Sequence, residues 1–148
     1  MGSPQTDIWQ TQTHLSQRLL TWAGLSIGAG LTLARFGDRF WRGVGAQGVG
    51  WGLIDGALAL FGLRRARAES AQPEAHAPAR QADERAKLRR ILALNTGLDV
   101  GYVLGGLALA RSRHDKFWRG TGLGIVIQGG FLFVFDLLHV LNLREVRV

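Results

Sequence analysis

The sequence contains no cysteine, and it has only three prolines, one methionine and one tyrosine among its 148 residues. Without cysteine the chain forms no disulfide, has no thiolate nucleophile and cannot hold a Cys-ligated zinc or iron–sulfur site. The Walker, Rossmann, H-E-x-x-H and G-x-S-x-G patterns are also missing. The sequence therefore predicts no metal site, no cofactor and no catalytic centre of a soluble type.

Acidic residues are few as well. The chain has 11 Asp and Glu against 18 Lys and Arg, which gives a net charge of +7. Such an excess favours an anionic partner, either nucleic acid or a membrane surface. The most basic segment, residues 64–90, lacks the interleaved aromatic residues of RNA-binding segments. We therefore expect it to bind anionic lipid headgroups and expect no nucleic acid partner.

Lysine and arginine are absent from four long apolar stretches, residues 19–34, 44–63, 91–110 and 120–143, of 16, 20, 20 and 24 residues. About 20 mainly apolar residues span the core of a bilayer. Glycine, with 21 residues, costs about 1 kcal/mol in a soluble helix but allows membrane helices to approach closely. These features favour an all-α integral membrane protein over a soluble helical bundle.

A repeat divides the chain into two halves. FWRG occurs at residues 40–43 and again at 117–120, 77 positions later, and Gly30–Arg35 matches Gly106–Arg111 at 76 positions. A further match, of Gln47 and Asp55 with Gln128 and Asp136, lies at 81 positions and places four extra residues in the second copy. The repeat predicts a four-helix bundle made of two helical hairpins.

The predicted organisation has four parts. An N-terminal tail (1–18) precedes the first transmembrane hairpin (19–63), and a basic cytoplasmic linker (64–90) leads to the second hairpin with a short C-terminal tail (91–148). The end of the linker, residues 82–90, is expected to extend the third span or to lie on headgroups. The termini and linker hold 11 of the 18 cations. The positive-inside rule thus predicts a multi-pass protein of the cell inner (plasma) membrane with both termini cytoplasmic.

The two FWRG copies are interpreted as membrane-interface anchors. Each copy lies where a short hairpin loop leads into the next span. The tryptophan rings suit the aromatic belt of a bilayer, and the arginines can reach headgroups. The predicted anchors are Trp41, Arg42, Trp118 and Arg119.

The candidate site consists of polar residues inside the spans. Asp55, Asp99 and Asp136 lie seven or eight residues from the linker-side ends of their spans, about 12 Å deep. An Asp at a helix centre costs about 2.5–3.5 kcal/mol, so three of them require a reason. Three carboxylates at one depth, with no Lys or Arg in the spans, are not expected all to be ionised. The other candidates for a ligand or proton site are His139, Asn95, Gln47, Gln128 and Tyr102.

Small residues recur four apart in every span. Such spacing places glycines on one helix face, where they allow close helix contact. Because two spans carry three glycines each, some of these faces are candidates for a homodimer interface. The glycines in question are Gly24 and Gly28, then Gly48, Gly52 and Gly56, then Gly97, Gly101 and Gly105, and Gly120 and Gly124.

Residues 48–63 (GVGWGLIDGALALFGL), 94–106 (LNTGLDVGYVLGG) and 122–139 (GLGIVIQGGFLFVFDLLH) resemble an uncharacterised family of small bacterial four-helix membrane proteins. The resemblance implies the membrane topology and brings no established activity.

Three functions stay open from the sequence. The carboxylate layer predicts binding or transport of a proton, a cation or a small amphiphile. The glycine faces instead favour a non-catalytic structural or accessory subunit that packs with itself or a partner. An intramembrane enzyme would use Asp136 and His139 as acid and base.

Overall fold

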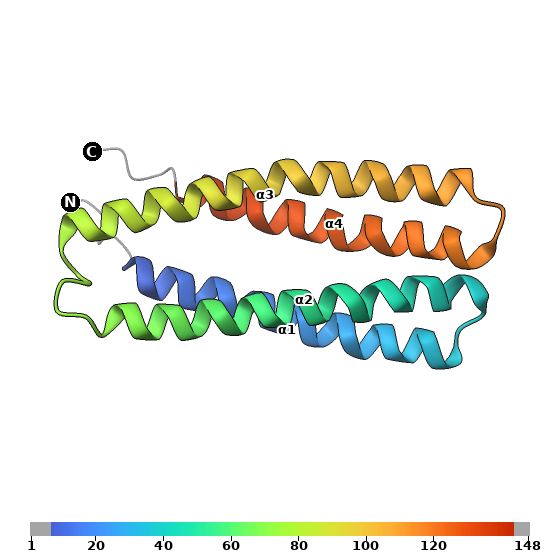
Figure 1. The fold of residues 1–148 in the computed structure, drawn as a ribbon, viewed down its shortest axis with the longest axis horizontal. Coiled ribbons are helices and arrows are strands. Elements are labelled where there is room, and N and C mark those ends of the chain that lie inside the picture. Colours follow the sequence, from blue (N-terminus) through green and yellow to red (C-terminus); the bar gives the residue numbers. More distant parts are fainter. Residues whose placement is uncertain (1–6, 144–148) are drawn as a thin grey trace.

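The computed structural model describes residues 7–143, and in this range all the regular secondary structure is helical (Figure 1). The helices are α1 (Ile8–Phe36), α2 (Arg39–Ser70), α3 (Pro78–Ser112) and α4 (Lys116–Asn142). The all-α, four-helix prediction is confirmed. The ends of the predicted tails, residues 1–6 and 144–148, lie outside the described residues.

Aspartate caps begin three of the helices. The side chains of Asp7, Asp38 and Asp115 each accept a hydrogen bond from backbone N–H groups in the first turn of α1, α2 and α4. These caps satisfy donors that have no partner inside the helix. Only residues 37–38 connect α1 to α2, and only 113–115 connect α3 to α4, so each pair folds back as an antiparallel hairpin.

The predicted linker is mostly helical. Helix α2 continues to Ser70 and α3 begins at Pro78, so residues 71–77 alone connect the two hairpins. Proline suits the first position of a helix because its missing N–H would have no partner there. The inclusion of residues 82–90 in α3 agrees with the expectation that they extend the third span. Helix α1 similarly begins at Ile8, well before the apolar stretch at 19–34.

Helices α2 and α4 form the centre of the bundle. Helix α1 packs on α2 and α3 packs on α4, while α1 and α3 approach each other only briefly. No Cα atom of α2 lies within 8 Å of a Cα atom of α3, and the same holds for α1 and α4. Figure 1 shows α2 and α3 as the two helices nearest the viewer. The hairpins therefore meet along α2 and α4.

Glycine contacts recur at constant separations in the two hairpins. A Cβ on Gly30 would lie 2.7 Å from the Gly45 carbonyl oxygen, and one on Gly106 would lie 2.7 Å from the Gly122 carbonyl oxygen. Equivalent positions in α1 and α3 differ by 76 in residue number, and equivalent positions in α2 and α4 differ by 77. Backbones this close leave no room for a side chain.

The close glycine contacts contradict the predicted match at 81 positions, of Gln47 and Asp55 with Gln128 and Asp136. Gly52 packs against the Ala23 carbonyl of α1, and Gly129, 77 positions later, packs against the Asp99 carbonyl of α3. Gly129 thus corresponds to Gly52 and not to Gly48. The four-residue insertion is not needed, because the glycines that determine helix contact keep one spacing.

The glycines of the two FWRG copies lie at the contact between the hairpins. A Cβ on Gly43 would overlap the Phe117 carbonyl, and a Cβ on Gly120 would overlap the Phe40 carbonyl. Each copy therefore packs against the backbone of the other. An exposed ion pair between Arg39 and Asp115, 2.8 Å long, adds a second link at this loop end, but exposed pairs contribute little stability.

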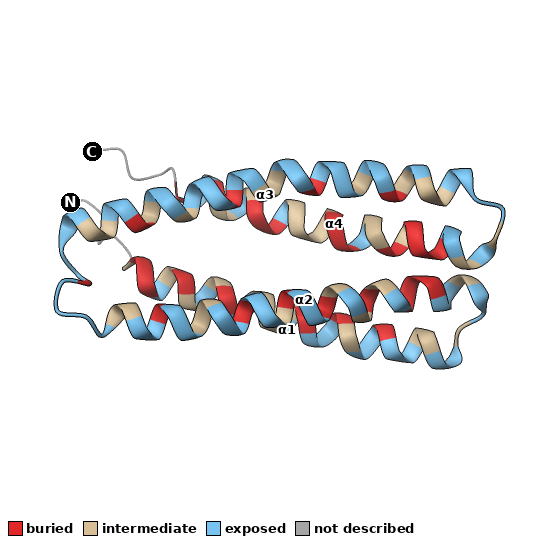
Figure 2. Cartoon of the chain, in the orientation of Figure 1, coloured by how far each residue is buried: buried red, intermediate tan, exposed pale blue. Residues whose placement is uncertain are grey.

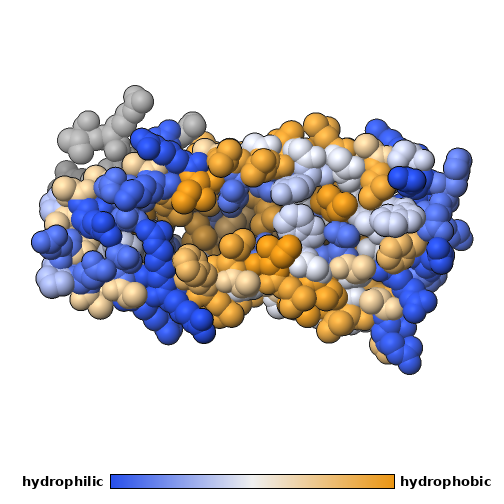
Figure 3. Space-filling view, in the orientation of Figure 1, coloured by the Kyte–Doolittle hydropathy of each residue, from blue (hydrophilic) through white to orange (hydrophobic). Residues whose placement is uncertain are grey.

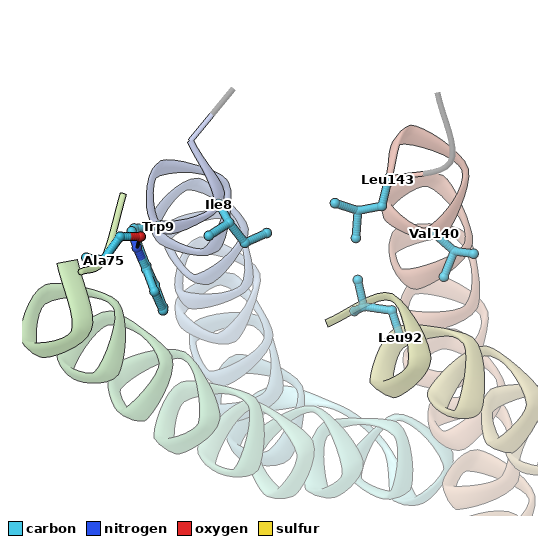
Figure 4. Close-up of a cluster of buried hydrophobic side chains, with 6 residues drawn as sticks. All are labelled: Ile8, Trp9, Ala75, Leu92, Val140 and Leu143. Atoms are coloured by element: carbon cyan, nitrogen blue, oxygen red, sulfur yellow. Dashed lines mark hydrogen bonds between the residues drawn. The ribbon is translucent and has the colours of Figure 1, made fainter. Parts of the chain in front are cut away.

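A hydrophobic cluster closes the opposite end of the bundle, called here the linker-side end. It joins the start of α1, the 71–77 connection, α3 and the end of α4 (Figure 4). The Trp9 indole N–H donates to the Ala75 carbonyl oxygen at 3.0 Å, and the Gln81 side chain accepts from the Ile8 N–H at 2.8 Å. Figure 2 shows the buried residues at this end and along the contacts between helices. The start of α1 is thus tied to the connection between hairpins.

Many large apolar side chains face outward. Leu25, Phe61 and Leu94 are 64%, 68% and 66% exposed. Figure 3 shows an apolar middle section with hydrophilic residues at both ends. All four helices are long and apolar enough to cross a membrane.

We expect Gly43→Ala to lower the free energy of unfolding by about 1–3 kcal/mol, because the new methyl group overlaps the Phe117 carbonyl. Gly50→Ala on the same helix is the matched control, since a Cβ there meets nothing within 4 Å. Thermal unfolding in mild detergent measures both. Equal melting temperatures for Gly43→Ala and the parent would contradict the close contact of α2 and α4.

The Asp7 carboxylate is expected to make the linker-side end sensitive to acid. Partial burial raises the pKa of Asp7, but hydrogen bonds from the Trp9 N–H and from His76 outweigh it and bring the pKa below 3.8. A carboxyl whose pKa is lower in the folded state stabilises the fold above its unfolded pKa, and this stabilisation is lost as the pH falls through the folded pKa. The melting temperature of Asp7→Asn should therefore fall less than that of the parent between pH 5 and pH 3. Parallel pH profiles would argue against this role of Asp7.

Candidate ligand cavity between α2 and α3

A cavity of about 430 Å³ lies between α2 and α3. These two helices supply most of its walls, and α1 and α4 form its back. Ile54, Leu58 and Leu98 line the cavity and are also exposed on the outer surface. The cavity therefore opens sideways through the gap where the backbones of α2 and α3 stay apart, and Figure 3 shows the hollow within the apolar section.

The three predicted aspartates all line this cavity. Asp55, Asp99 and Asp136 are only 2%, 3% and 6% exposed, and their carboxyl groups are close enough to interact electrostatically. The Asn95 side chain lines the same cavity and lies close to Asp136. Among the described residues, Asp55 Oδ2 and Asp99 Oδ2 have no hydrogen-bond partner. Buried oxygens without partners are costly, so they mark positions where a ligand can donate hydrogen bonds.

Close glycine contacts position two of these carboxylates. Gly52 brings α2 against Ala23 and Ile27 of α1, and Asp55 lies three positions further on the same face. Gly129 brings α4 to the backbone of α3 at Asp99. Both acids therefore lie buried inside the bundle beside close backbone contacts.

An aromatic pair lies next to the acids. Trp51 and Tyr102 meet edge to face, with ring centroids 5.1 Å apart, and both line the cavity. Trp51 precedes Asp55 by four positions and Tyr102 follows Asp99 by three, so each ring shares a helix face with one carboxylate. This ring contact joins α2 to α3 across the gap.

Charged residues surround the linker-side mouth of the cavity. Arg65 of α2 and Lys87 of α3 both line it. Arg65 pairs with Glu84 at 2.8 Å, and Lys87 pairs with Asp83 at 2.7 Å and with Glu84 at 3.3 Å. The buried Glu84 therefore links α2 and α3 at this end and balances the charge of the mouth.

The corresponding space between α1 and α4 is filled. Trp22 and Phe131 stack there with centroids 3.7 Å apart. Gln128 adds hydrogen bonds, accepting from the Trp22 indole N–H at 3.0 Å and donating to Ser26 Oγ at 3.4 Å. At the separations of 76 and 77, Trp22 corresponds to Leu98 and Phe131 to Ile54, two residues of the cavity wall. Smaller side chains at these positions leave the cavity open on one side of the bundle only.

Three of the predicted site residues lie elsewhere. Gln128 belongs to the α1–α4 contact, and Gln47 packs beside Gly124, where a Cβ would lie 2.7 Å from Gln47 Cβ. The His139 ring N–H donates to the Phe135 carbonyl oxygen at 2.6 Å. None of the three lines the cavity. The structure thus groups Asp55, Asp99, Asp136, Asn95 and Tyr102, and separates Gln47, Gln128 and His139 from them.

Sequence reasoning did not identify several cavity residues. Gln12 and Ser16 are buried in α1 and line the cavity, although the sequence placed them in a tail. The sequence carries no periodicity signal for their burial, because that signal counts apolar residues and Gln12 and Ser16 are polar. Glu84 had no signal either, since its partner Arg65 comes from another helix.

The predicted interface anchors are at the loop end of the bundle. Trp41 and Trp118 are 45% and 50% exposed, and the Arg42 side chain donates to the Ala34 carbonyl oxygen at 3.1 Å, at the end of α1. The anchoring role of Trp41, Arg42, Trp118 and Arg119 at a membrane interface stays a prediction.

The described residues contain no group of three or more His, Cys, Asp or Glu side chains that could hold a metal ion. The site is instead a mainly apolar cavity with carboxylates at its inner wall. Together with the four long apolar helices, it indicates a multi-pass membrane protein.

Residues 18–137 match the model of DUF6992, a family of unknown function. The chain belongs to this family, and the predicted resemblance to an uncharacterised family is confirmed. No curated protein and no solved structure matches the chain significantly.

Proposed function

We propose that the protein is a small multi-pass membrane protein that binds a small amphiphile in the α2–α3 cavity, as a binding protein or carrier. The observation that carries the proposal is the pair of buried, unpartnered oxygens, Asp55 Oδ2 and Asp99 Oδ2, in a cavity that opens sideways. The apolar side opening between α2 and α3 would accept a tail from the bilayer, and the carboxyl groups would bind the polar end. Binding sites of this kind combine apolar walls with few, well-placed polar groups.

We further propose that the chain arose by duplication of a helical hairpin. We also propose that it lies in a plasma membrane with both termini cytoplasmic. The recurring glycine contacts support the duplication. The start of α1, the end of α4 and the 71–77 connection share one end of the bundle, which supports placing them on the same side. The excess of Lys and Arg at this end favours the cytoplasmic side.

Filling the cavity should abolish binding. Ile54→Phe with Leu98→Trp would reproduce the Trp22–Phe131 stack on the other side of the bundle. With a diazirine-bearing dodecanol as photoprobe in lipid nanodiscs, we expect peptides of residues 51–65 and 87–102 of the parent to be labelled, and labelling to fall about tenfold in the filled variant.

The matched control is Leu25→Phe with Leu31→Trp, which adds the same groups on an exposed face of α1 away from the cavity. It should label like the parent. Labelling that is unchanged in the filled variant would rule out the cavity as the binding site.

A structural or accessory role is a second candidate, favoured by the outer face of α3. A Cβ on Gly97, Gly101 or Gly105 would meet nothing within 4 Å, so this predicted contact face is unused within the chain. In a homodimer, it would allow two copies of α3 to approach closely.

The absence of cysteine makes this second candidate testable. It predicts that Gly101→Cys forms disulfide-linked dimers on mild oxidation in membranes, whereas Gly50→Cys, at another open glycine, does not. Equal cross-linking of both variants, or of neither, would argue against a dimer through α3.

A further inference from the structure

We propose that the ligand of the α2–α3 cavity is an amphiphilic organic cation, meaning an ammonium or similar group that carries an apolar tail. This inference rests on the proposed function, because it names the chemical class of ligand for the same cavity.

The carboxylates of the inner wall have no cationic partner. Among the described residues, no ion pair involves Asp55, Asp99 or Asp136. Two of their buried oxygens also lack any hydrogen-bond donor. A carboxyl group away from water either stays protonated or needs a positive partner or a hydrogen-bond donor for its charged form. A bound cation would supply the positive partner that the chain does not.

The basic residues at the mouth do not oppose a cation. Glu84 and Asp83 pair with Arg65 and Lys87, so both positive side chains that line the cavity are already balanced by acids. Glu84 is buried, which keeps this pairing out of water. The net charge of the cavity wall is therefore determined by the three inner aspartates.

The aromatic rings favour an organic cation over a bare metal ion. Trp51 and Tyr102 lie on the same helix faces as Asp55 and Asp99, and aromatic faces attract ammonium groups by about 0.5–2 kcal/mol. A small inorganic cation needs several oxygen ligands, but half of the residues that line the cavity are leucine, isoleucine or phenylalanine. Alkyl substituents on a nitrogen fit such walls.

The shape of the cavity leaves room for the alkyl tail of such a ligand. The wall between the mouth and the acids is formed by apolar side chains such as Leu58, Phe61 and Leu88. The gap between α2 and α3 leaves this wall open to the side, so an alkyl chain can leave the cavity into lipid while its charged group stays at the acids.

The test compares three probes with the same tail: dodecyltrimethylammonium, dodecanol and dodecyl sulfate. Each competes with the diazirine-bearing dodecanol for the parent protein in nanodiscs of zwitterionic lipid, with salt added to screen surface charge. We expect the ammonium to compete at about tenfold lower concentration than dodecanol, a free-energy difference of about 1.4 kcal/mol, and the sulfate to compete least. This comparison needs no variant.

Asp55→Asn with Asp99→Asn should remove the preference for the ammonium and leave competition by dodecanol unchanged. If this variant does not fold, Trp51→Leu tests the same site through the aromatic ring and should reduce the preference several-fold.

The outcomes separate the two proposals. If dodecanol competes as well as the ammonium and the filled variant blocks both, the cavity binds amphiphiles but the inference of a cation is wrong. If dodecyl sulfate competes best, the inference is also wrong. If the filled variant does not alter labelling at all, the proposed function itself fails.

Discussion

The backbone contact between α2 and α4 at Gly43 and Gly120 is the constraint on which the rest of the structure depends. Each glycine packs against a carbonyl of the other FWRG copy, and this contact joins the two hairpins at the loop end. A side chain at either position would push the helices apart. Because α2 and α4 occupy the centre, their close approach leaves α1 and α3 on opposite sides, and it creates two gaps, one between α1 and α4 and one between α2 and α3.

The two gaps differ because their side chains differ. Large stacked rings and a hydrogen-bonded Gln128 fill the α1–α4 gap, whereas Ile54 and Leu98 leave the other open. An approximately symmetric backbone thus holds a cavity on one side only. Asp55 and Asp136 show the same asymmetry: at a separation of 77 their counterparts are Leu132 and Ala59. The acids come together in the α2–α3 cavity without being equivalent positions.

Stability and the proposed ligand binding make opposite demands on this cavity. Close packing of side chains and paired polar groups stabilise a helical bundle. Around the cavity, apolar side chains lack packing contacts with one another and two carboxyl oxygens lack hydrogen-bond partners. Contacts around the cavity compensate for this loss. The Trp51–Tyr102 ring contact, the Arg65–Glu84 pair and the cluster of Ile8 with Leu92 hold its borders together.

The sequence by itself determined four apolar helices, the hairpin loops and the burial of three aspartates, because length, apolar runs and helical spacing are local properties. It also indicated that the FWRG copies border the second helix of each hairpin. Only the tertiary structure decided which polar residues meet. His139 and Gln128 share helical spacing with the acids but turn to Phe135 and to α1, since the direction of a helix face depends on how neighbouring helices pack. The same holds for Glu84 and for the α2–α3 gap, which no local pattern specifies.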